Sequence, residues 1–429
     1  MSEILINNVD FAGGGKYNVK IKGNLISSIE KVAEESDGTS FEGDSLGGEV
    51  KVIDGRGKVL LPGFVNMHTH SSMTLMRGAR EDDKLQSWLK AIWKMESKLD
   101  PEIVYWGTKL ACLEMIKTGT TCFFDEYLRT TYSSKAAMEM SLRSYHGYEF
   151  LNFFNKSKIE ECKAQCLRKY KESESWSEIV KFVVSIHSPY TVSPELILWA
   201  SDFAKENGLL FNIHLSETEK EVMDSIRAHG LSPVAYLEKL GVLGPNVVAA
   251  HSLWLNDEDI EILGRHHVTT VHNINSNLKL SSGYKFKYKE LKMAGANVCI
   301  GTDGCASSNN LDLLEAMKTA AMVQKAWRGD PTVMPINELL DIATVNAAKV
   351  LGLNMGRIEV GKLADLILID IQNYAFTPNI NFYANLIYSA NSSCVDTLIC
   401  NGKVLMEHRM VEGEKEILEQ ANIIYKRLL

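Results

Sequence analysis

Residues 60–70 read Leu-Leu-Pro-Gly-Phe-Val-Asn-Met-His-Thr-His, an apolar run that ends in two histidines. In a strand, residues i and i+2 share one face, so the imidazoles of His68 and His70 can reach one ion. A His-x-His motif also occurs as two surface histidines, but the apolar run before this one indicates burial. Because two buried histidines without partners would be costly, we predict that a bound metal ion satisfies them.

After Pro62-Gly63, short apolar runs alternate with helical patterns such as 103–117 and 194–206. We predict strands at Phe64–His68, Thr121–Asp125, Tyr148–Phe154, Val180–His187, Leu209–His214, Val247–His251, Val268–His272 and Asn297–Asp303. Eight β/α units over about 240–300 residues fit a parallel (β/α)8 barrel of the α/β class.

The two flanks of this region have strand character. Short alternating runs fill residues 3–34 and 52–61, and further runs lie at 364–371, 395–400 and 404–406, before a terminal helix at 414–429. Residues 35–49 are polar and rich in glycine, which predicts an exposed loop. We expect residues 1–61 and 363–429 to form the two parts of one discontinuous β-sandwich beside a barrel of residues 62–362.

Polar residues fall at the ends of the predicted strands, where the active site of such a barrel lies. Seven strands end in a residue that can bind metal or move protons, and the third has only His146 just before it; the seven are His68, Asp125, His187, His214, His251, His272 and Asp303. His214 and Asp303 are the best further ligands for the ion at His68 and His70. Three imidazoles and one carboxylate suit Zn²⁺, and less well Fe²⁺ or Mn²⁺.

Two other groups of residues bear on this chemistry. Glu217 follows His214 by three residues, so it lies either beside the metal or at an exposed helix start, and the spacing fits both. The eight cysteines form no Cys-x-x-Cys pair, which favours reduced, mostly buried thiols. The His-x-Glu and Pro-Cys-x-x-Cys signature of the zinc cytidine deaminases is absent.

Composition excludes several classes of protein. The 429 residues are 45% hydrophobic and 23% charged, which is typical of a globular chain. The formal net charge of −8 disfavours a nucleic acid partner. No signal peptide or long apolar segment is visible, so we expect a cytoplasmic protein without a membrane partner.

Together, these stretches resemble the amidohydrolase superfamily over essentially the whole chain. The resemblance is strongest to the branch of 5-methylthioadenosine/S-adenosylhomocysteine deaminases, which also includes guanine deaminase-like enzymes and triazine hydrolases. The stretches that carry it are 62–70, 76–78, 187–190, 214–218, 250–251, 276–280 and 301–304.

The resemblance implies roles for individual residues. His68, His70, His214 and Asp303 match the metal ligands of the family. Glu217 matches its proton shuttle, and His251 matches the residue that orients the attacking hydroxide.

Further residues match positions that contact the substrate. Glu96 matches the glutamate that holds the ribose hydroxyls, and His187 matches a substrate-contacting histidine. Trp88 matches an aromatic residue near the nucleoside, although packing of a helix would explain it equally well.

The resemblance implies an aminohydrolase, a hydrolase that acts on the C–N bonds of cyclic amidines. It would replace the C6 amino group of adenosine or a 5′-substituted adenosine, giving the inosine analogue and ammonia. Candidate substrates are 5′-deoxyadenosine, 5′-methylthioadenosine and S-adenosylhomocysteine. The expected partner is a small nucleoside, and the oligomeric state, a homo-oligomer included, is left open.

The chain departs from the family at two places. The Arg-Gly pair expected after the third strand is missing from residues 143–149, and bidentate arginine is the best partner for the carboxylate of S-adenosylhomocysteine. Glu126 stands where the family often has methionine, which predicts an acidic group near the mouth and a neutral or cationic substituent.

Two alternatives remain at this point. One is another hydrolase of the same branch that acts on guanine, another base or a triazine, against which Glu96 argues because it would hold a ribose. The other is a barrel that has lost catalysis and serves as a structural or interaction protein. The complete set of ligands argues against the second alternative.

Overall fold

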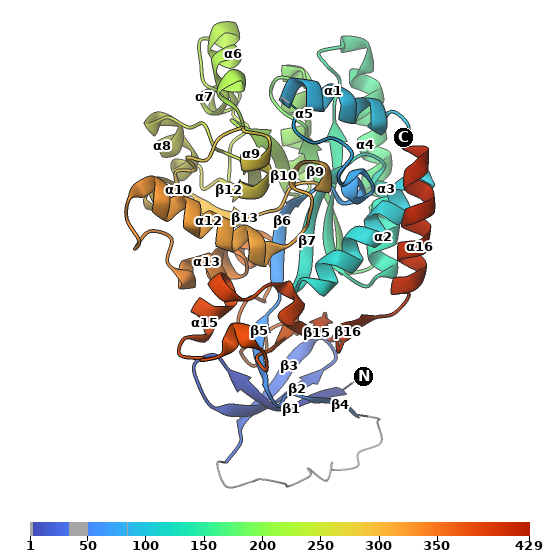
Figure 1. The fold of residues 1–429 in the computed structure, drawn as a ribbon. Helices are drawn as coiled ribbons and strands as arrows, with labels where there is room; N and C mark the ends of the chain where they lie inside the picture. Colours follow the sequence, from blue (N-terminus) through green and yellow to red (C-terminus); the bar gives the residue numbers. More distant parts are fainter. Residues whose placement is uncertain (1–2, 34–49, 84) are drawn as a thin grey trace.

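The structure is a computed structural model that describes residues 3–33, 50–83 and 85–429. The predicted loop at residues 35–49 lies outside the described residues. Two sheets organise the rest: a ring of parallel strands surrounded by helices, and a second sheet at one end of it (Figure 1). The α/β fold class predicted from the sequence, a (β/α)8 barrel with a small discontinuous β-sandwich from the two flanks, is confirmed, and the strands of both flanks join in one sheet.

The barrel contains eight parallel strands that follow one another in sequence order. They are β6 (Phe64–Thr69), β7 (Thr120–Tyr127), β8 (Arg143–Phe150), β9 (Val180–Ile186), β10 (Phe211–Leu215), β11 (Val247–His251), β12 (Thr269–His272) and β13 (Asn297–Ile300). The last strand lies against the first and closes the ring. Strands buried on both faces are expected where helices cover the outside of a parallel sheet.

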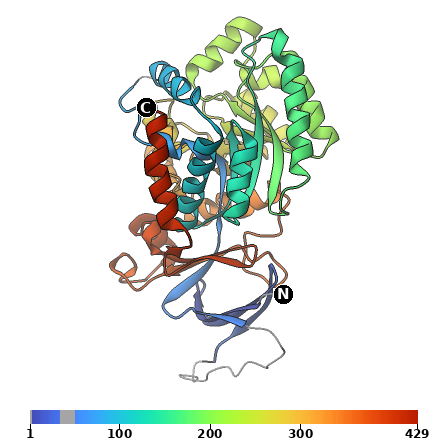
Figure 2. The ribbon, with the colours of Figure 1, turned by 90° about the vertical axis from the view of Figure 1, so that its right-hand side faces the viewer.

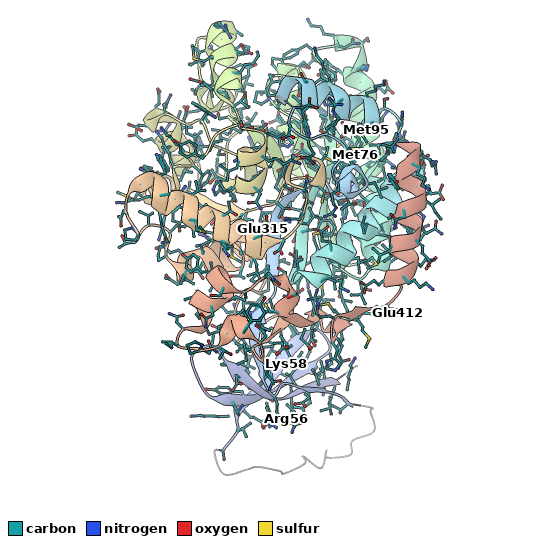
Figure 3. All side chains as sticks on the ribbon, in the orientation of Figure 1. Arg56, Lys58, Met76, Met95, Glu315 and Glu412 are labelled. Atoms are coloured by element: carbon teal, nitrogen blue, oxygen red, sulfur yellow. The ribbon has the colours of Figure 1, made fainter. Side chains whose placement is uncertain are left out.

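Helices follow most of the strands. They are α2 (Pro101–Lys117), α3 (Thr130–Glu139), α4 (Ile159–Ser173), α5 (Pro194–Glu206), α6 (Glu219–His229), α7 (Pro233–Lys239), α8 (Asp257–Arg265), α9 (Ile274–Lys279), α10 (Tyr288–Ala294), α11 (Cys305–Ser308), α12 (Leu313–Arg328), α13 (Ile336–Ile342) and α14 (Val345–Val350). The short 3-10 helices η1 (Ser71–Met76) and η2 (Lys156–Lys158) and the helix α1 (Leu85–Glu96) lie in the connections. Met76 is fully buried in a cluster with residues of α1 (Figure 3).

The second sheet joins both ends of the chain in the order β17-β16-β15-β14-β5-β1-β2-β3, with β4 paired to β1. Its strands are β1 (Glu3–Phe11), β2 (Lys16–Lys22), β3 (Leu25–Lys31), β4 (Val50–Asp54), β5 (Lys58–Pro62), β14 (Leu366–Asp370), β15 (Val395–Cys400), β16 (Lys403–Glu407) and β17 (Met410–Val411). Apolar side chains from both ends of the chain, such as Ile6 and Leu366, form one buried cluster within it. The boundaries drawn at residues 61/62 and 362/363 stay predictions.

The remaining elements lie near the C-terminus. They are η3 (Tyr374–Phe376), α15 (Phe382–Ala384), the π-helix η4 (Asn385–Ser389), η5 (Ser392–Cys394), α16 (Glu414–Ile424) and η6 (Tyr425–Arg427). Helix α16 leaves the second sheet and runs along α2 toward the opposite end of the barrel (Figure 2). Within the described ranges, none of the helices combines the length and apolar character needed to cross a bilayer.

The third barrel strand was predicted wrongly at Tyr148–Phe154. It runs from Arg143 to Phe150, while Phe153 and Phe154 are exposed with positive φ angles of 48° and 58°. Polar residues in the first half of β8 prevented its prediction as a buried strand. In the structure they have partners elsewhere in the fold, as the ion pair between Arg143 and Asp365 shows. Sequence patterns cannot reveal such pairing, because the partner lies far away in the chain.

Gly63 joins the two sheets, between β5 and β6. A Cβ atom at this position would lie 2.2 Å from the side chain of Thr121. Only glycine therefore allows β6 to enter the barrel this close to β7. This junction brings the His-x-His motif to the carboxyl end of the first barrel strand.

Candidate metal centre and active site

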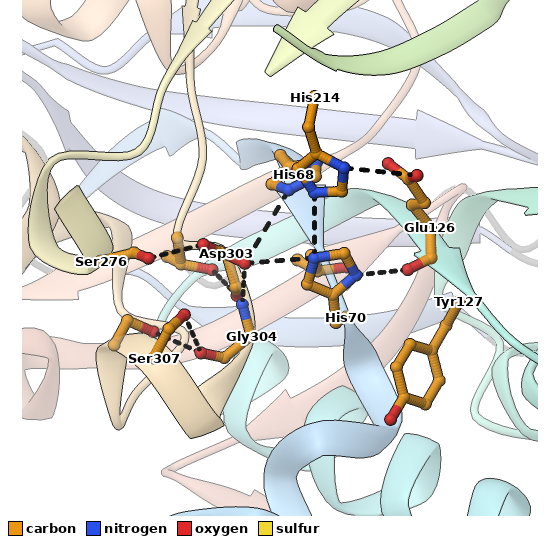
Figure 4. Close-up of polar contacts among 12 residues, drawn as sticks. His68, His70, Glu126, Tyr127, His214, Ser276, Asp303, Gly304 and Ser307 are labelled. Atoms are coloured by element: carbon orange, nitrogen blue, oxygen red, sulfur yellow. Dashed lines mark hydrogen bonds and ion pairs between the residues drawn. The ribbon is translucent and has the colours of Figure 1, made fainter. Parts of the chain in front are cut away.

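Four buried side chains meet at the carboxyl ends of the barrel strands (Figure 4). His68 lies in β6, His70 directly follows it, His214 lies in β10 and Asp303 follows β13. His70 Nε2 is 3.2 Å from Asp303 Oδ1 and 3.3 Å from His214 Nε2, and His68 Nε2 is 3.9 Å from Asp303 Oδ1. The structure thus brings together the four residues predicted as ligands.

The far ring nitrogens of two of these histidines are fixed by the backbone. His70 Nδ1 donates to the carbonyl oxygen of Glu126, and His214 Nδ1 donates to that of His187 at 2.8 Å. Such bonds set the tautomer and direct the Nε2 lone pair of each ring toward the other. Two converging lone pairs repel one another, so a positive charge between them is favoured.

His68 supplies the clearest sign of a missing partner. Its side chain is fully buried, and neither ring nitrogen has a hydrogen-bond partner within the described residues. Burial holds its pKa well below the usual range, so the ring stays neutral and keeps a lone pair for a cation. Ligand atoms around tetrahedral zinc lie roughly 3.3 Å apart, which matches the His70–His214 spacing. The residues therefore fit a divalent metal ion.

Asp303 gives this cluster its negative charge. Burial alone would raise its pKa, but the contact with His70 holds the pKa well below the usual range. Ser276 Oγ donates a hydrogen bond to Asp303 Oδ2 at 2.6 Å. The backbone of Asp303 has a φ of 65°, which turns its side chain back toward the strand ends. The same contact raises the pKa of His70 to about 10 against the effect of burial, so a proton and a metal ion compete for its Nε2, and the ring is neutral only when the ion is bound.

His251 lies at the end of β11, beside the cluster. Its ring is 5.7 Å from that of His68 between centroids, and its Nδ1 donates to Asn277 Oδ1 at 2.9 Å. Its φ of 68° is unusual for a residue other than glycine, and such strain is concentrated at functional sites. The bond to Asn277 leaves Nε2 free for a ligand.

Glu217 lies in the loop between β10 and α6. Ser282 Oγ donates to its Oε1 at 3.1 Å, while Glu221 accepts hydrogen bonds from the backbone amides of Ser216 and Glu217, each at 2.8 Å. Glu221 thus fixes the backbone that carries Glu217. Of the two interpretations that the spacing allowed, the structure favours the one in which Glu217 faces the cavity beside His214.

A cavity opens above the cluster and holds about 790 Å³ of free space, part of it open to solvent. Its lining consists of His70, Met73, Trp88, Leu89, Ile92, Trp93, Glu96, Tyr127, Leu128, Glu149, Leu151, His187, Tyr190, His214, Glu217, His251, Leu280, Asp303 and Ser307. The cavity therefore contains every predicted site residue except His68, which lies beneath it.

The predicted substrate contacts lie on one side of this cavity. Glu96 ends α1, accepts a hydrogen bond from Tyr127 Oη at 2.9 Å, and has a pKa raised by burial. His187 is held by Thr191 Oγ1 at 2.9 Å, and burial lowers its pKa to about 4, so it is neutral near pH 7. Trp88 both lines the cavity and packs in the cluster under α1, so both interpretations of it hold.

Three strand-end residues take no part in the cavity. Asp125 accepts hydrogen bonds from the backbone and hydroxyl of Ser71, and so fixes the turn after His70. His272 stacks on Phe286, and its ring nitrogens have no partner within the described residues. His146 lies within β8, not before it, and contacts two serine hydroxyls.

Two glutamates differ from expectation. Glu126 was predicted near the mouth, but it is fully buried behind His214, with its Oε1 3.6 Å from His214 Nδ1. Glu149, which was not predicted as a site residue, lines the cavity from the end of β8. A correct placement of the third strand would have found it, since Glu149 is the acid nearest the end of that strand.

Comparison with known proteins agrees with this geometry. Residues 59–405 match the model of the amidohydrolase family. The chain belongs to the amidohydrolase family. The superfamily predicted from its sequence is confirmed.

Curated relatives of this amidohydrolase extend over most of its length. It is 45% identical over 377 residues to a 5'-deoxyadenosine deaminase of Methanoregula boonei, covering 86% of this chain and 84% of that one. It is 41% identical over 415 residues to the 5-methylthioadenosine/S-adenosylhomocysteine deaminase 1 of Archaeoglobus fulgidus, covering 96% and 95%.

Solved structures share the fold. An adenosine deaminase from Xanthomonas campestris with bound zinc superposes with a TM-score of 0.90 at 28% identity, covering 99% of this chain and 98% of that one. A zinc complex of atrazine chlorohydrolase from Arthrobacter aurescens gives a TM-score of 0.86 at 22% identity, covering 98% and 100%. This amidohydrolase is thus an enzyme of the class that hydrolyses C–N bonds, with a site built for a divalent metal.

Proposed function

We propose that this enzyme deaminates the adenine ring of adenosine or a 5′-substituted adenosine, giving the inosine analogue and ammonia. The observation that carries the proposal is the presence of three features in one cavity: the buried His/Asp cluster, Glu217 and Glu96. The names of the 38–45% identical relatives support the same reaction.

His68, His70, His214 and Asp303 would hold the metal. Three neutral imidazoles and one carboxylate are the ligand set that zinc prefers, so we propose Zn²⁺ as the native ion. When bound, the ion acts as a Lewis acid and lowers the pKa of a water molecule toward about 7.

The proton transfers fall to three side chains. Asp303 accepts a proton from the attacking water, and His251, with Nδ1 committed to Asn277, holds that water through Nε2. Glu217 gives a proton to the ring nitrogen next to C6, so that negative charge does not build up there. Help of this kind is worth roughly 10²–10⁴ in rate. Asp303 then passes its proton to the amino group, which leaves as ammonia, and the C6 hydroxyl returns a proton to Glu217 as the carbonyl forms.

Glu96 and His187 orient the sugar. The Glu96 carboxyl accepts from Tyr127, which leaves its other oxygen for ribose hydroxyls. Glu96→Ala should therefore reduce kcat/KM for adenosine by about tenfold or more and change that for free adenine less. Equal losses with the two substrates would contradict a role at the ribose.

The deciding experiment is a substrate panel with metal analysis. Adenosine, 5′-deoxyadenosine, 5′-methylthioadenosine, S-adenosylhomocysteine, adenine and guanine would be followed by loss of the adenine band and release of ammonia. We expect about one zinc per chain and turnover of the adenosines. Turnover of guanine or a triazine alone would favour the other hydrolases of the branch.

We also propose that the enzyme works in the cytoplasm, because its eight thiols are unpaired, as is usual in a reducing compartment. A homo-oligomer stays a prediction, which the molecular mass in solution would test.

A further inference from the structure

Glu149 is an acid in the cavity that the proposed mechanism does not use. It lies on β8, where its backbone is in register with Ser185 of the neighbouring strand β9, two residues before His187. No hydrogen bond to its carboxyl group is found among the described residues, whereas Glu96 accepts one from Tyr127. Glu149 is therefore the carboxyl of this wall without a protein partner.

Among aspartate, glutamate, lysine and arginine, only the acidic residues line the cavity. Its lining contains the carboxyl groups of Glu96, Glu149, Glu217 and Asp303, and no lysine or arginine. Arg143, on the same strand as Glu149, is committed to Asp365 at the opposite end of the barrel. An anionic 5′ substituent near Glu149 would therefore find no lysine or arginine in the cavity and would meet an unpaired carboxylate.

Glu149 lies on the sugar side. Glu217, the proposed proton donor to the ring, is fixed by Ser282, which follows β12, so the reacting ring belongs near that strand. β8 lies four strands from β12 in the ring, across the cavity, and beside it lies Glu96, whose charge acts on Glu149. A nucleoside with its ribose at Glu96 would direct its 5′ carbon toward this wall.

We propose that Glu149 is a specificity-determining residue that selects nucleosides by the charge of the 5′ substituent, favouring cationic over neutral and neutral over carboxylate-bearing groups. The inference rests on the proposed function, since it assumes a purine nucleoside in this cavity. It transfers to Glu149 the preference that the sequence suggested for Glu126, which lies behind His214 and does not line the cavity.

Three nucleosides that share one skeleton test the proposal. They are 5′-methylthioadenosine, its S-methyl sulfonium derivative and 5′-carboxymethylthioadenosine, which are neutral, cationic and anionic and have the same adenine ring. The assays are run at pH 8.5, because burial and then the charge of Glu96 raise the pKa of Glu149 to about 7. The wild-type kcat/KM should fall in the order cation, neutral, anion.

Glu149→Gln keeps the size of the side chain and removes its charge. It should lower kcat/KM for the sulfonium about tenfold, raise it for the carboxylate about tenfold, and change it for the neutral nucleoside less than about threefold. Glu149→Asp should restore the wild-type order. Glu219→Gln, an exposed charge removed from the same end of the barrel outside the cavity, should change none of the ratios.

Binding separates this inference from the proposed function. Calorimetry with the metal-loaded enzyme and the three matching inosine products measures the charge preference without turnover. Suppose that Glu149→Gln changes the ratio of the affinities for the cationic and anionic products, but that the wild-type enzyme turns over no adenosine. The proposed reaction is then wrong and the charge selection stands. A Glu149→Gln variant that shifts all three nucleosides by one factor, or binds none of the products differently, overturns the inference.

Discussion

The two ends of the barrel bury polar groups in opposite ways. At the amino ends of the strands, Arg143 meets Asp365 at 2.9 Å and 3.3 Å and also donates to Asn401 at 3.0 Å. At the carboxyl ends, His68 is equally buried but has no hydrogen-bond partner within the described residues. Both sets are closed off from water, yet only one is satisfied by the protein itself.

This difference indicates that the polar groups at the amino ends of the strands stabilise the fold, while those at the carboxyl ends are available for binding and reaction. A buried ion pair that is fully bonded holds two units of the fold together, here β8 of the barrel and Asp365, the residue just before the strand β14 of the second sheet. A buried histidine without a partner is costly unless something from outside completes it. The unsatisfied end is therefore the one that can bind and react, which agrees with the usual place of barrel active sites.

The largest expected effect lies at the carboxyl ends. Glu217→Gln should reduce kcat on adenosine by roughly 10²–10⁴, because it removes the proton donor. Metal content and the denaturant midpoint should stay at wild-type values, since Glu217 is outside the His/Asp cluster. Steady-state kinetics and metal analysis check this together. Full activity in the variant would remove Glu217 from the mechanism.

At the amino ends, Arg143→Met should act on stability instead. The change leaves Asp365 as an unpaired buried charge, so the free energy of unfolding should fall by about 3–5 kcal/mol. Urea unfolding measures it. The matched control is Arg357→Met, which breaks an exposed pair with Asp341 and should cost no more than about 1 kcal/mol.

A similar loss in both variants would show that the buried pair has no special role. A change in kcat/KM larger than the change in stability explains would contradict the separation of the two ends, because Arg143 does not reach the cavity.

The smallest expected effect compares two histidines at the carboxyl ends of the strands, His68 and His272. His272 is also buried without ring partners, but it stacks on Phe286 and does not line the cavity. Burial lowers its pKa from 6.5 to about 3. The unfolded chain therefore takes up a proton before the folded one, and stability falls as the pH falls from 6.5 toward 3.

At pH 5 this group should remove about 2 kcal/mol relative to its contribution above pH 6.5. His272→Gln should reduce the loss of stability between pH 8 and pH 5 by that amount, as measured by urea unfolding at both values. The other histidines act in both proteins and cancel in the difference. An unchanged pH dependence in the variant would mean that His272 is protonated in the fold.

Much of the molecule follows from local pattern. Helix α5 and the strand β15 have the bounds that the sequence predicts, because the apolar period and the proline at the first turn of α5 decide them locally. The His-x-His motif after an apolar strand likewise identifies two of the proposed metal ligands from sequence alone. A strand that ends in a polar residue can be predicted from sequence wherever its apolar residues form an uninterrupted run.

What the sequence could not give depends on partners far away in the chain. The strand β8 was predicted too far along the chain, because Arg143 and His146 are polar residues that a sequence pattern assigns to the surface. In the structure they are buried and pair with Asp365 and with serine hydroxyls. As a result Glu149 was missed at its end.

The sequence by itself determined the barrel and the family, and it predicted the proposed His/Asp ligand set, because periodicity and contiguous motifs specify these features. Only the tertiary structure decided which buried polar groups are satisfied and which converge unpaired. It placed Glu126 behind His214, Glu149 in the cavity and His272 outside it. The physical reason is that hydrogen-bond satisfaction is a property of neighbours in space, and a strand pattern specifies only which face a side chain takes.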